Sequence, residues 1–133
     1  EASSVLDTKL LTVAKKRSDR IADKEYDQFS LILFDIRSAE LGASNRSIID
    51  LIKPYVKPTS QISITGLSDR LGDATLNQTL AEQRARVVAK ALGVAQTASV
   101  RGIGNAMTYD PDLPEGRLYT RTVEIVIETP TAP

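Results

Sequence analysis

The chain contains no cysteine and no histidine, and these two absences exclude a large part of protein chemistry. Without cysteine there are no disulfides, no thiolate metal ligands and no cysteine nucleophiles. Without histidine there is no Ser-His-Asp or Cys-His catalytic arrangement and no imidazole-bound metal. Few enzyme classes remain, so we expect a protein that is not an enzyme and that holds neither a cofactor nor a metal.

An excess of one charge and long apolar runs are missing as well. The 17 basic residues balance 17 acidic ones, which argues against nucleic acid as a partner and against electrostatic binding to a membrane surface. No apolar run approaches the ~20 residues of a membrane-spanning helix. The chain opens at Glu1 without a signal-peptide or lipobox pattern, and its 133 residues suit one domain with its own core. We therefore expect a mature fragment or an excised domain.

The apolar pattern alternates between strands and helices. A near-continuous apolar run at 29–34 predicts a strand that is buried on both faces. A helical stripe begins at Ser44 and should end or kink at Pro54. Further strands are expected at 61–65, 99–103 and 121–128. Together with a second helix, this order predicts an α/β (α+β) sandwich of order βαβαβ-β: a mixed four-stranded sheet with two main helices packed on one face.

Residues 1–27 fall outside that pattern and form an N-terminal extension. They fit either a strand at 9–15 or a charged helix at 14–29, and we favour a strand that belongs to an upstream domain. The predicted division of the chain is an extension at 1–27, a domain at 28–128 and a C-terminal tail at 129–133.

The second helix is the most informative element of the sequence. Leu76, Leu80, Val87 and Ala91 recur at steps of three and four residues and predict its buried stripe. A capping box of Thr75 and Gln78 should begin the helix, and Gly93 should end it.

Arg84 interrupts this apolar stripe at a position where an apolar residue is expected. Its guanidinium must therefore meet an anion or reach water. Asn77 and Leu80 lie on the same helix face as Arg84. Leu80 is expected to be buried, so that its truncation costs more stability than truncation of Arg84.

Asp69, just past the strand at 61–65, is the natural counterpart of Arg84, and two interpretations are open. The two side chains either bind the ammonium and the carboxylate of one ligand, or they pair with each other. Spacing alone favours the internal salt bridge, because structural ion pairs are common.

A set of ordered motifs changes this balance. The motifs are Gly66-Leu67-Ser68-Asp69, Gly72, Asn77, Leu80-Ala81, Arg84-Ala85, Leu33-Phe34-Asp35 with Ser38 and Leu41, Gly102-Ile103-Gly104, Gly116-Arg117 and Thr120-Arg121-Thr122-Val123-Glu124-Ile125. Together they resemble the OmpA-like peptidoglycan-binding family (the OmpA C-terminal, Pal and MotB type). The resemblance covers roughly 28–128, and several motifs in order are far more specific than one. Three positions depart from the family pattern: Leu67 replaces a histidine, Ser68 a threonine and Thr122 an arginine.

The resemblance implies non-covalent binding of peptidoglycan through the diaminopimelate group of its stem peptide. Asp69 should hold the ammonium of that group and Arg84 its carboxylate, with Asn77 orienting the ligand. Two further contacts are implied, from the loop at Ile36 and Arg37 and from Arg121, which starts the last strand. Such a domain would anchor an envelope protein to the cell wall in the periplasm, attached to the outer membrane through a part outside this sequence.

Two other functions remain as alternatives. The fold can serve as a docking or dimerisation module of an envelope secretion, motor or adhesin complex, and a homodimer belongs to this class. The change at Leu67 is compatible with that role. A glycosidase using Asp35 and Asp69 as its carboxylate pair ranks third, because nothing in the sequence places them across a sugar.

Overall fold

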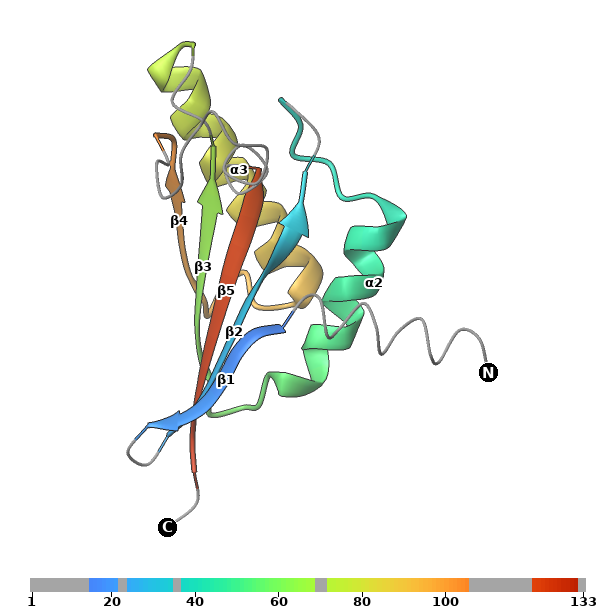
Figure 1. Cartoon of the computed structure of the whole chain (residues 1–133), viewed down its shortest axis with the longest axis vertical. Helices are drawn as coiled ribbons and strands as arrows, with labels where there is room; N and C mark the ends of the chain where they lie inside the picture. Colours follow the sequence, from blue (N-terminus) through green and yellow to red (C-terminus); the bar gives the residue numbers. More distant parts are fainter. Residues whose placement is uncertain (1–14, 22–23, 35–36, 69–71, 106–120, 132–133) are drawn as a thin grey trace.

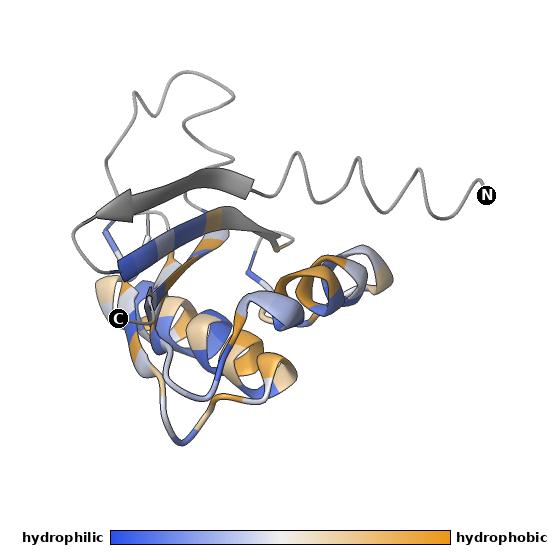
Figure 2. Ribbon diagram, turned by 90° about the horizontal axis from the view of Figure 1, so that it is seen from below, coloured by the Kyte–Doolittle hydropathy of each residue, from blue (hydrophilic) through white to orange (hydrophobic). Residues whose placement is uncertain are grey.

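The structure, a computed structural model, describes residues 15–21, 24–34, 37–68, 72–105 and 121–131. These residues form a twisted sheet with two helices on one of its faces (Figures 1 and 2). Within this part of the chain, neither helix combines the length and the apolar character needed to cross a bilayer.

The sheet has five strands in the order β1-β2-β5-β3-β4. The strands are β1 (Lys15–Ile21), β2 (Lys24–Leu33), β3 (Gln61–Leu67), β4 (Ser99–Ile103) and β5 (Thr122–Pro130). β3 and β4 are parallel, and β5 lies antiparallel between β2 and β3. The C-terminal ends of β2, β3 and β4 therefore lie at the same end of the sheet, where β5 begins (Figure 1). The predicted mixed four-stranded sheet is confirmed as β2-β5-β3-β4.

The N-terminal strands differ from the sequence expectation. The strand expected at 9–15 lies outside the described residues except for Lys15, where β1 begins. The alternative of a helix over 14–29 is wrong, because the described residues of this range form β1 and β2, which pair antiparallel. β2 starts at Lys24 rather than at Phe29. Its charged first half is held extended by backbone pairing with β1 on one side and β5 on the other, so pairing overrides local pattern. β1 thus adds a fifth strand to this domain's own sheet.

Both predicted helices are present. α2 (Ala43–Ile52) is followed by the short 3-10 helix η1 (Lys53–Tyr55), with Pro54 in its first turn. The predicted end of the α-helix near Pro54 is therefore confirmed, since proline removes a backbone donor. α3 (Ala74–Leu92) is the longer helix and ends at Gly93, which has a left-handed φ of 81°.

The hydrophobic core fills the space between the sheet and the helices. Val123, Ile125 and Ile127 of β5 are fully buried, as their alternation predicts. The ring of Phe29 meets that of Tyr55 edge to face at 5.3 Å. The buried cluster consists of Phe29, Phe34, Ile48, Ile49, Ile52, Ile62, Ile64, Ala85, Val88, Ala89, Leu92, Val94, Val123, Ile125 and Ile127. The sequence predicts that the strand at 29–34 is buried on both faces. In this range the structure describes the side chains of Phe29 and Phe34 only, and both are buried.

The buried face of α3 is displaced from the predicted stripe. Leu76 is 69 % exposed, and Leu80 is only half-buried. The residues that face the sheet are instead Ala81, Arg84, Ala85, Val88, Ala89 and Leu92. This face is rich in alanine because α3 lies very close to the sheet.

Three glycines permit that close approach. A Cβ atom at Gly66 would overlap the carbonyl oxygen of Ala81, and one at Gly102 would overlap the backbone of Ala81 and Glu82. A Cβ atom at Gly104 would overlap the backbone of α3 near its start. The Gly102-x-Gly104 pattern therefore allows α3 to pack closely against β4, and this close contact leaves no room for bulky side chains of α3.

The start of α3 also differs from expectation. Asp73 is the N-cap, and its carboxylate accepts a hydrogen bond of 2.9 Å from the backbone N–H of Leu76. The capping box of Thr75 and Gln78 is wrong, because the helix begins one residue before Thr75. The side chain of Gln78 bonds instead to β4.

Candidate ligand-binding site

Arg84 projects from α3 into the interior and is only 1 % exposed. Its Nε–H donates to the carbonyl oxygen of Ser38 at 2.8 Å, and an Nη1–H donates to the carbonyl oxygen of Leu67 at 3.0 Å. Its guanidinium carbon lies 5.4 Å from the centroid of the Phe34 ring. Arg84 therefore connects α3 to the loop after β2 and to the end of β3.

These bonds decide how Arg84 can hold a carboxylate. A guanidinium has five N–H groups, and the two carbonyls use two of them. Because Nε is one of the two, the side-on arrangement that needs Nε is excluded. A carboxylate bound to Arg84 would therefore have to use its Nη groups.

The charge of Arg121 acts on Arg84. The pKa of Arg84 is lowered from its ordinary value to about 10, first because burial disfavours its charge and second because Arg121 is also positive. Arg84 still carries its proton at neutral pH. Arg121 is placed here by the sheet, since its carbonyl accepts a 2.8 Å hydrogen bond from the backbone N–H of Phe34.

Arg121 also contains a buried polar group without a partner. Its Nε is buried and makes no hydrogen bond, the one side-chain atom of this kind among the described residues. A buried unpaired N–H group is unfavourable. An anion close to these two groups would offset both unfavourable effects.

The other predicted site residues fall into two groups. Asn77 is half-buried in the first turn of α3, on the face that carries Arg84. Arg37 is exposed and has a positive φ of 58°, which is uncommon for a residue other than glycine. Asp69 and Ile36 lie outside the described residues, so whether Asp69 pairs with Arg84 stays a prediction.

Two hollows are present on the described surface. One of about 360 Å³ is lined by the loop after β2 and the start of α2 (Ser38, Glu40, Leu41, Gly42, Ala43, Ser44 and Asn45). It shares Ser38 with the surroundings of Arg84. A larger one of about 510 Å³ lies near the start of β2 and the end of α2. It contains none of the predicted site residues.

Comparison with known proteins now adds to this geometry. The sequence matches the OmpA family over residues 33–108. The chain belongs to the OmpA family. No curated protein matches it significantly.

Solved structures agree with this OmpA-family fold. The cell wall anchor of the type VI secretion system (T6SS) from Pseudomonas aeruginosa has 24% identity and a TM-score of 0.66, with 97% of both chains covered. The periplasmic domain of Helicobacter pylori MotB has 20% identity and a TM-score of 0.65, with 88% of this chain and 90% of that one covered. The peptidoglycan-associated lipoprotein from Burkholderia pseudomallei has 22% identity and a TM-score of 0.61, with 74% and 88% covered. OmpA-like domains are anchoring domains without catalytic activity, so the prediction that the chain is not an enzyme is confirmed.

Family membership gives the departure at Leu67 a structural meaning. The side chain of Leu67 is 3 % exposed and belongs to the interior. Its contribution to Arg84 is a backbone carbonyl, which any residue at this position supplies. The change from histidine to leucine therefore leaves this anchor of Arg84 in place. Sequence reasoning missed Leu67 and Ser38 as partners of Arg84, because carbonyl groups carry no side-chain signal.

Proposed function

We propose that this OmpA-family domain binds peptidoglycan non-covalently and anchors an envelope protein to the cell wall. Two structurally similar proteins, a cell wall anchor and a peptidoglycan-associated lipoprotein, support this role. The MotB neighbour is a periplasmic domain, which supports a periplasmic location. Attachment to the outer membrane through a part beyond this sequence, and residues 28–128 as the binding module, belong to the same proposal.

The arginine pair is the observation that carries the proposal. Arg84 is buried, and the positive charge of Arg121 disfavours the charge of Arg84. A bound carboxylate offsets this repulsion and lies within the field of both cations. The site thus favours an acidic ligand over a neutral one.

We assign the ligand as the free amino-acid end of diaminopimelate in the stem peptide. Its carboxylate would bind Arg84, with Arg121 as second cation, and its ammonium would bind Asp69. Asn77 would orient the ligand, and the backbone at Ile36 and Arg37 would contact it. Lysine-type stem peptides lack this second carboxylate, so they leave the arginines without their anion.

Asp69→Asn is the sharpest test, because it removes one charge with little change of shape. The matched control is Asp73→Asn, which removes a nearby negative charge while asparagine still caps α3. Sedimentation with purified cell-wall sacculi measures retention. We expect wild type and Asp73→Asn to bind diaminopimelate-type sacculi and to bind lysine-type sacculi poorly. Asp69→Asn should bind about 30-fold more weakly, corresponding to roughly 2 kcal/mol for one partner of a charged hydrogen bond.

Equal retention on both wall types would contradict the diaminopimelate assignment. Wild-type protein that binds neither wall would contradict peptidoglycan binding and favour the docking alternative. Arg84 is unsuitable for this test, since its replacement also releases the carbonyls of Ser38 and Leu67 and would mix folding with binding.

A further inference from the structure

Among the described residues, β4 is the outermost strand on one side of the sheet. The backbone N–H of Ser68 donates to the carbonyl of Ile103 at 3.0 Å, so Ile103 faces β3. Successive residues of a strand direct their backbone groups to opposite sides. Val100, Gly102 and Gly104 therefore direct theirs outward, to the side where another strand would pair.

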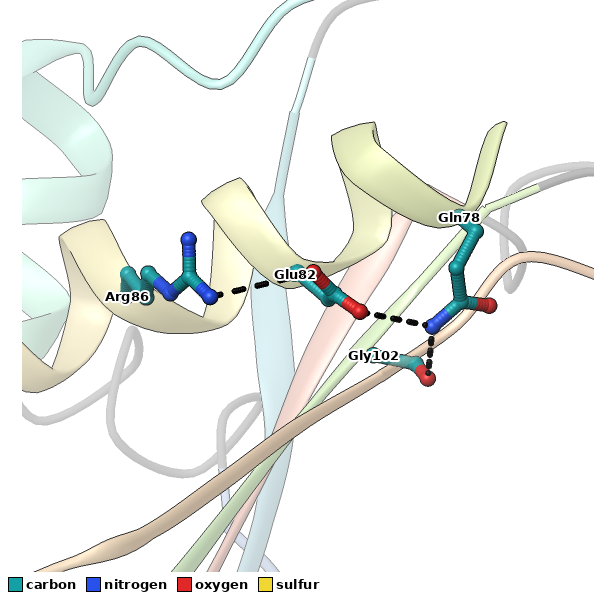
Figure 3. Close-up of polar contacts among 4 residues, drawn as sticks. All are labelled: Gln78, Glu82, Arg86 and Gly102. Atoms are coloured by element: carbon teal, nitrogen blue, oxygen red, sulfur yellow. Dashed lines mark hydrogen bonds and ion pairs between the residues drawn. The ribbon is translucent and has the colours of Figure 1, made fainter. Parts of the chain in front are cut away.

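The side chain of Gln78 occupies part of this outer edge. Its Nε2 donates to the carbonyl of Gly102 at 2.9 Å, and its Oε1 accepts from the N–H of Gly104 at 3.0 Å (Figure 3 shows the first bond). A residue of a neighbouring parallel strand would bind the same two groups. The carboxamide of Gln78 thus replaces one residue of an additional strand.

Neighbouring side chains on α3 hold this carboxamide in place. The second Nε2 proton of Gln78 is directed to Glu82 at 3.1 Å, and Glu82 lies 3.7 Å from Arg86 (Figure 3). Gly102 and Gly104 let the helix come close enough for Gln78 to reach the strand. Each polar group of the carboxamide therefore has a partner, although the side chain is exposed.

We propose that the outer edge of β4 is a strand-addition surface for a second copy of this domain, and that Gln78 blocks this pairing by occupying backbone groups of the edge. Exposed edge strands are templates for pairing, and proteins block them with covering groups. The edge is self-complementary: about a twofold axis at Gly102, antiparallel pairing sets Val100 opposite Gly104 of the second copy. In this register Arg101 lies opposite Ile103 of the second copy, and the two Arg101 residues are offset by two positions along the strands rather than directly opposite. The glycine at the centre adds no side chain to either face of the sheet.

Association through this edge has to break the bonds of Gln78 to Gly102 and Gly104. The loss of these two hydrogen bonds weakens the association of wild-type protein. A variant without the carboxamide has no such bonds to lose. Gln78→Ala should therefore self-associate roughly tenfold or more tightly than wild type, given the usual contribution of two hydrogen bonds.

The experiment compares Gln78→Ala with Gln83→Ala, which truncates an exposed glutamine of the same helix. Sedimentation equilibrium measures self-association, and amide hydrogen exchange locates it. We expect wild type and Gln83→Ala to remain monomeric where Gln78→Ala dimerises. In the dimer the amides of Val100 and Gly102 should gain protection as protein concentration rises.

Gln78→Glu provides a second variant with the same length of side chain. At neutral pH its carboxylate cannot donate to Gly102 and is repelled by Glu82, so it should dimerise. Its protonated form can both donate and accept, so it should return to monomer near pH 4. The proposal is overturned if both variants stay monomeric, if the dimer protects a surface other than the β4 edge, or if wild-type protein already pairs there.

Discussion

Arg121, which we propose as part of the ligand site, carries two features that are unfavourable for the fold. Its charge disfavours that of Arg84, and its buried Nε has no hydrogen-bond partner among the described residues. Both effects are unfavourable in the ligand-free domain. Binding sites often carry such features, and replacing them tends to stabilise a protein while weakening its function.

Arg121→Met should therefore stabilise the ligand-free domain by about 1 kcal/mol, because methionine keeps the aliphatic stem and removes both the charge and the unpaired group. Urea unfolding measures this, with Arg46→Met, on the exposed surface of α2, as a control that should change little. The same variant should bind diaminopimelate-type sacculi more weakly. A destabilised Arg121→Met would show that Arg121 has a structural role instead.

This stabilisation should be equal at pH 6 and pH 8. The pKa of Arg84 is lowered to about 10, so in the folded state it releases its proton only well above that window, while the unfolded state retains its proton up to higher pH still. The penalty on its charge is therefore fully present below pH 10 and decreases only as pH rises through that value. The chain has no histidine that would titrate between the two conditions. Unfolding at both pH values checks the expectation, and a stabilisation that differs between them would contradict it.

At the scale of elements, α3 combines a small-residue face toward the sheet with larger side chains at its flanks. Three leucines along this one helix differ in burial. Leu92 is 5 % exposed, Leu80 is half-buried and Leu76 is 69 % exposed. They form an internal series for the energetic cost of truncation.

Leu92→Ala should cost roughly 2–5 kcal/mol, the range for buried leucines. Leu80→Ala should cost less, and Leu76→Ala should stay within about 0.5 kcal/mol, as surface changes do. Thermal or urea unfolding of the three variants gives the order. The buried stripe predicted from the sequence includes Leu76 and therefore requires a large loss of stability in Leu76→Ala. Such a loss would contradict the buried face described here and support the predicted stripe.

The first turn of α3 provides another comparison. Asp73→Ala should destabilise the domain by about 1 kcal/mol, because it removes the acceptor for the N–H of Leu76. Thr75→Ala should have little effect, since Thr75 is not the N-cap. Circular dichroism melts of both variants test this assignment, and a larger loss in Thr75→Ala would support a capping box instead.

At the scale of the whole molecule, the sheet divides into a four-stranded part and the added edge strand β1. Every residue of the described core cluster lies between Phe29 and Ile127. The chain shortened to 24–131 should therefore unfold cooperatively and retain peptidoglycan binding, although it exposes the edge of β2. Calorimetry and sacculus sedimentation measure the two properties. Loss of cooperative unfolding would make β1 an integral part of the fold.

The sequence by itself determined the order of strands and helices from the second half of β2 onward, the core alternation of β5 and the identity of Arg84 as the unusual residue of its helix. These features depend on local periodicity and on side-chain chemistry, which a sequence displays directly. The order of family motifs added the family and its fold, and the ligand class that it implies stays a proposal. Asp69 and Ile36 stay predictions, because they lie outside the described residues.

Only the tertiary structure decided the buried face of α3, because glycines of β3 and β4, distant in sequence, let small residues of the helix approach the sheet. It also brought Arg121 beside Arg84, through the pairing of β5 with β2. The partners of Arg84 are backbone carbonyls, which are the same for every residue type. The target of Gln78 is likewise the backbone of β4, and only folding brings that strand within reach of the side chain.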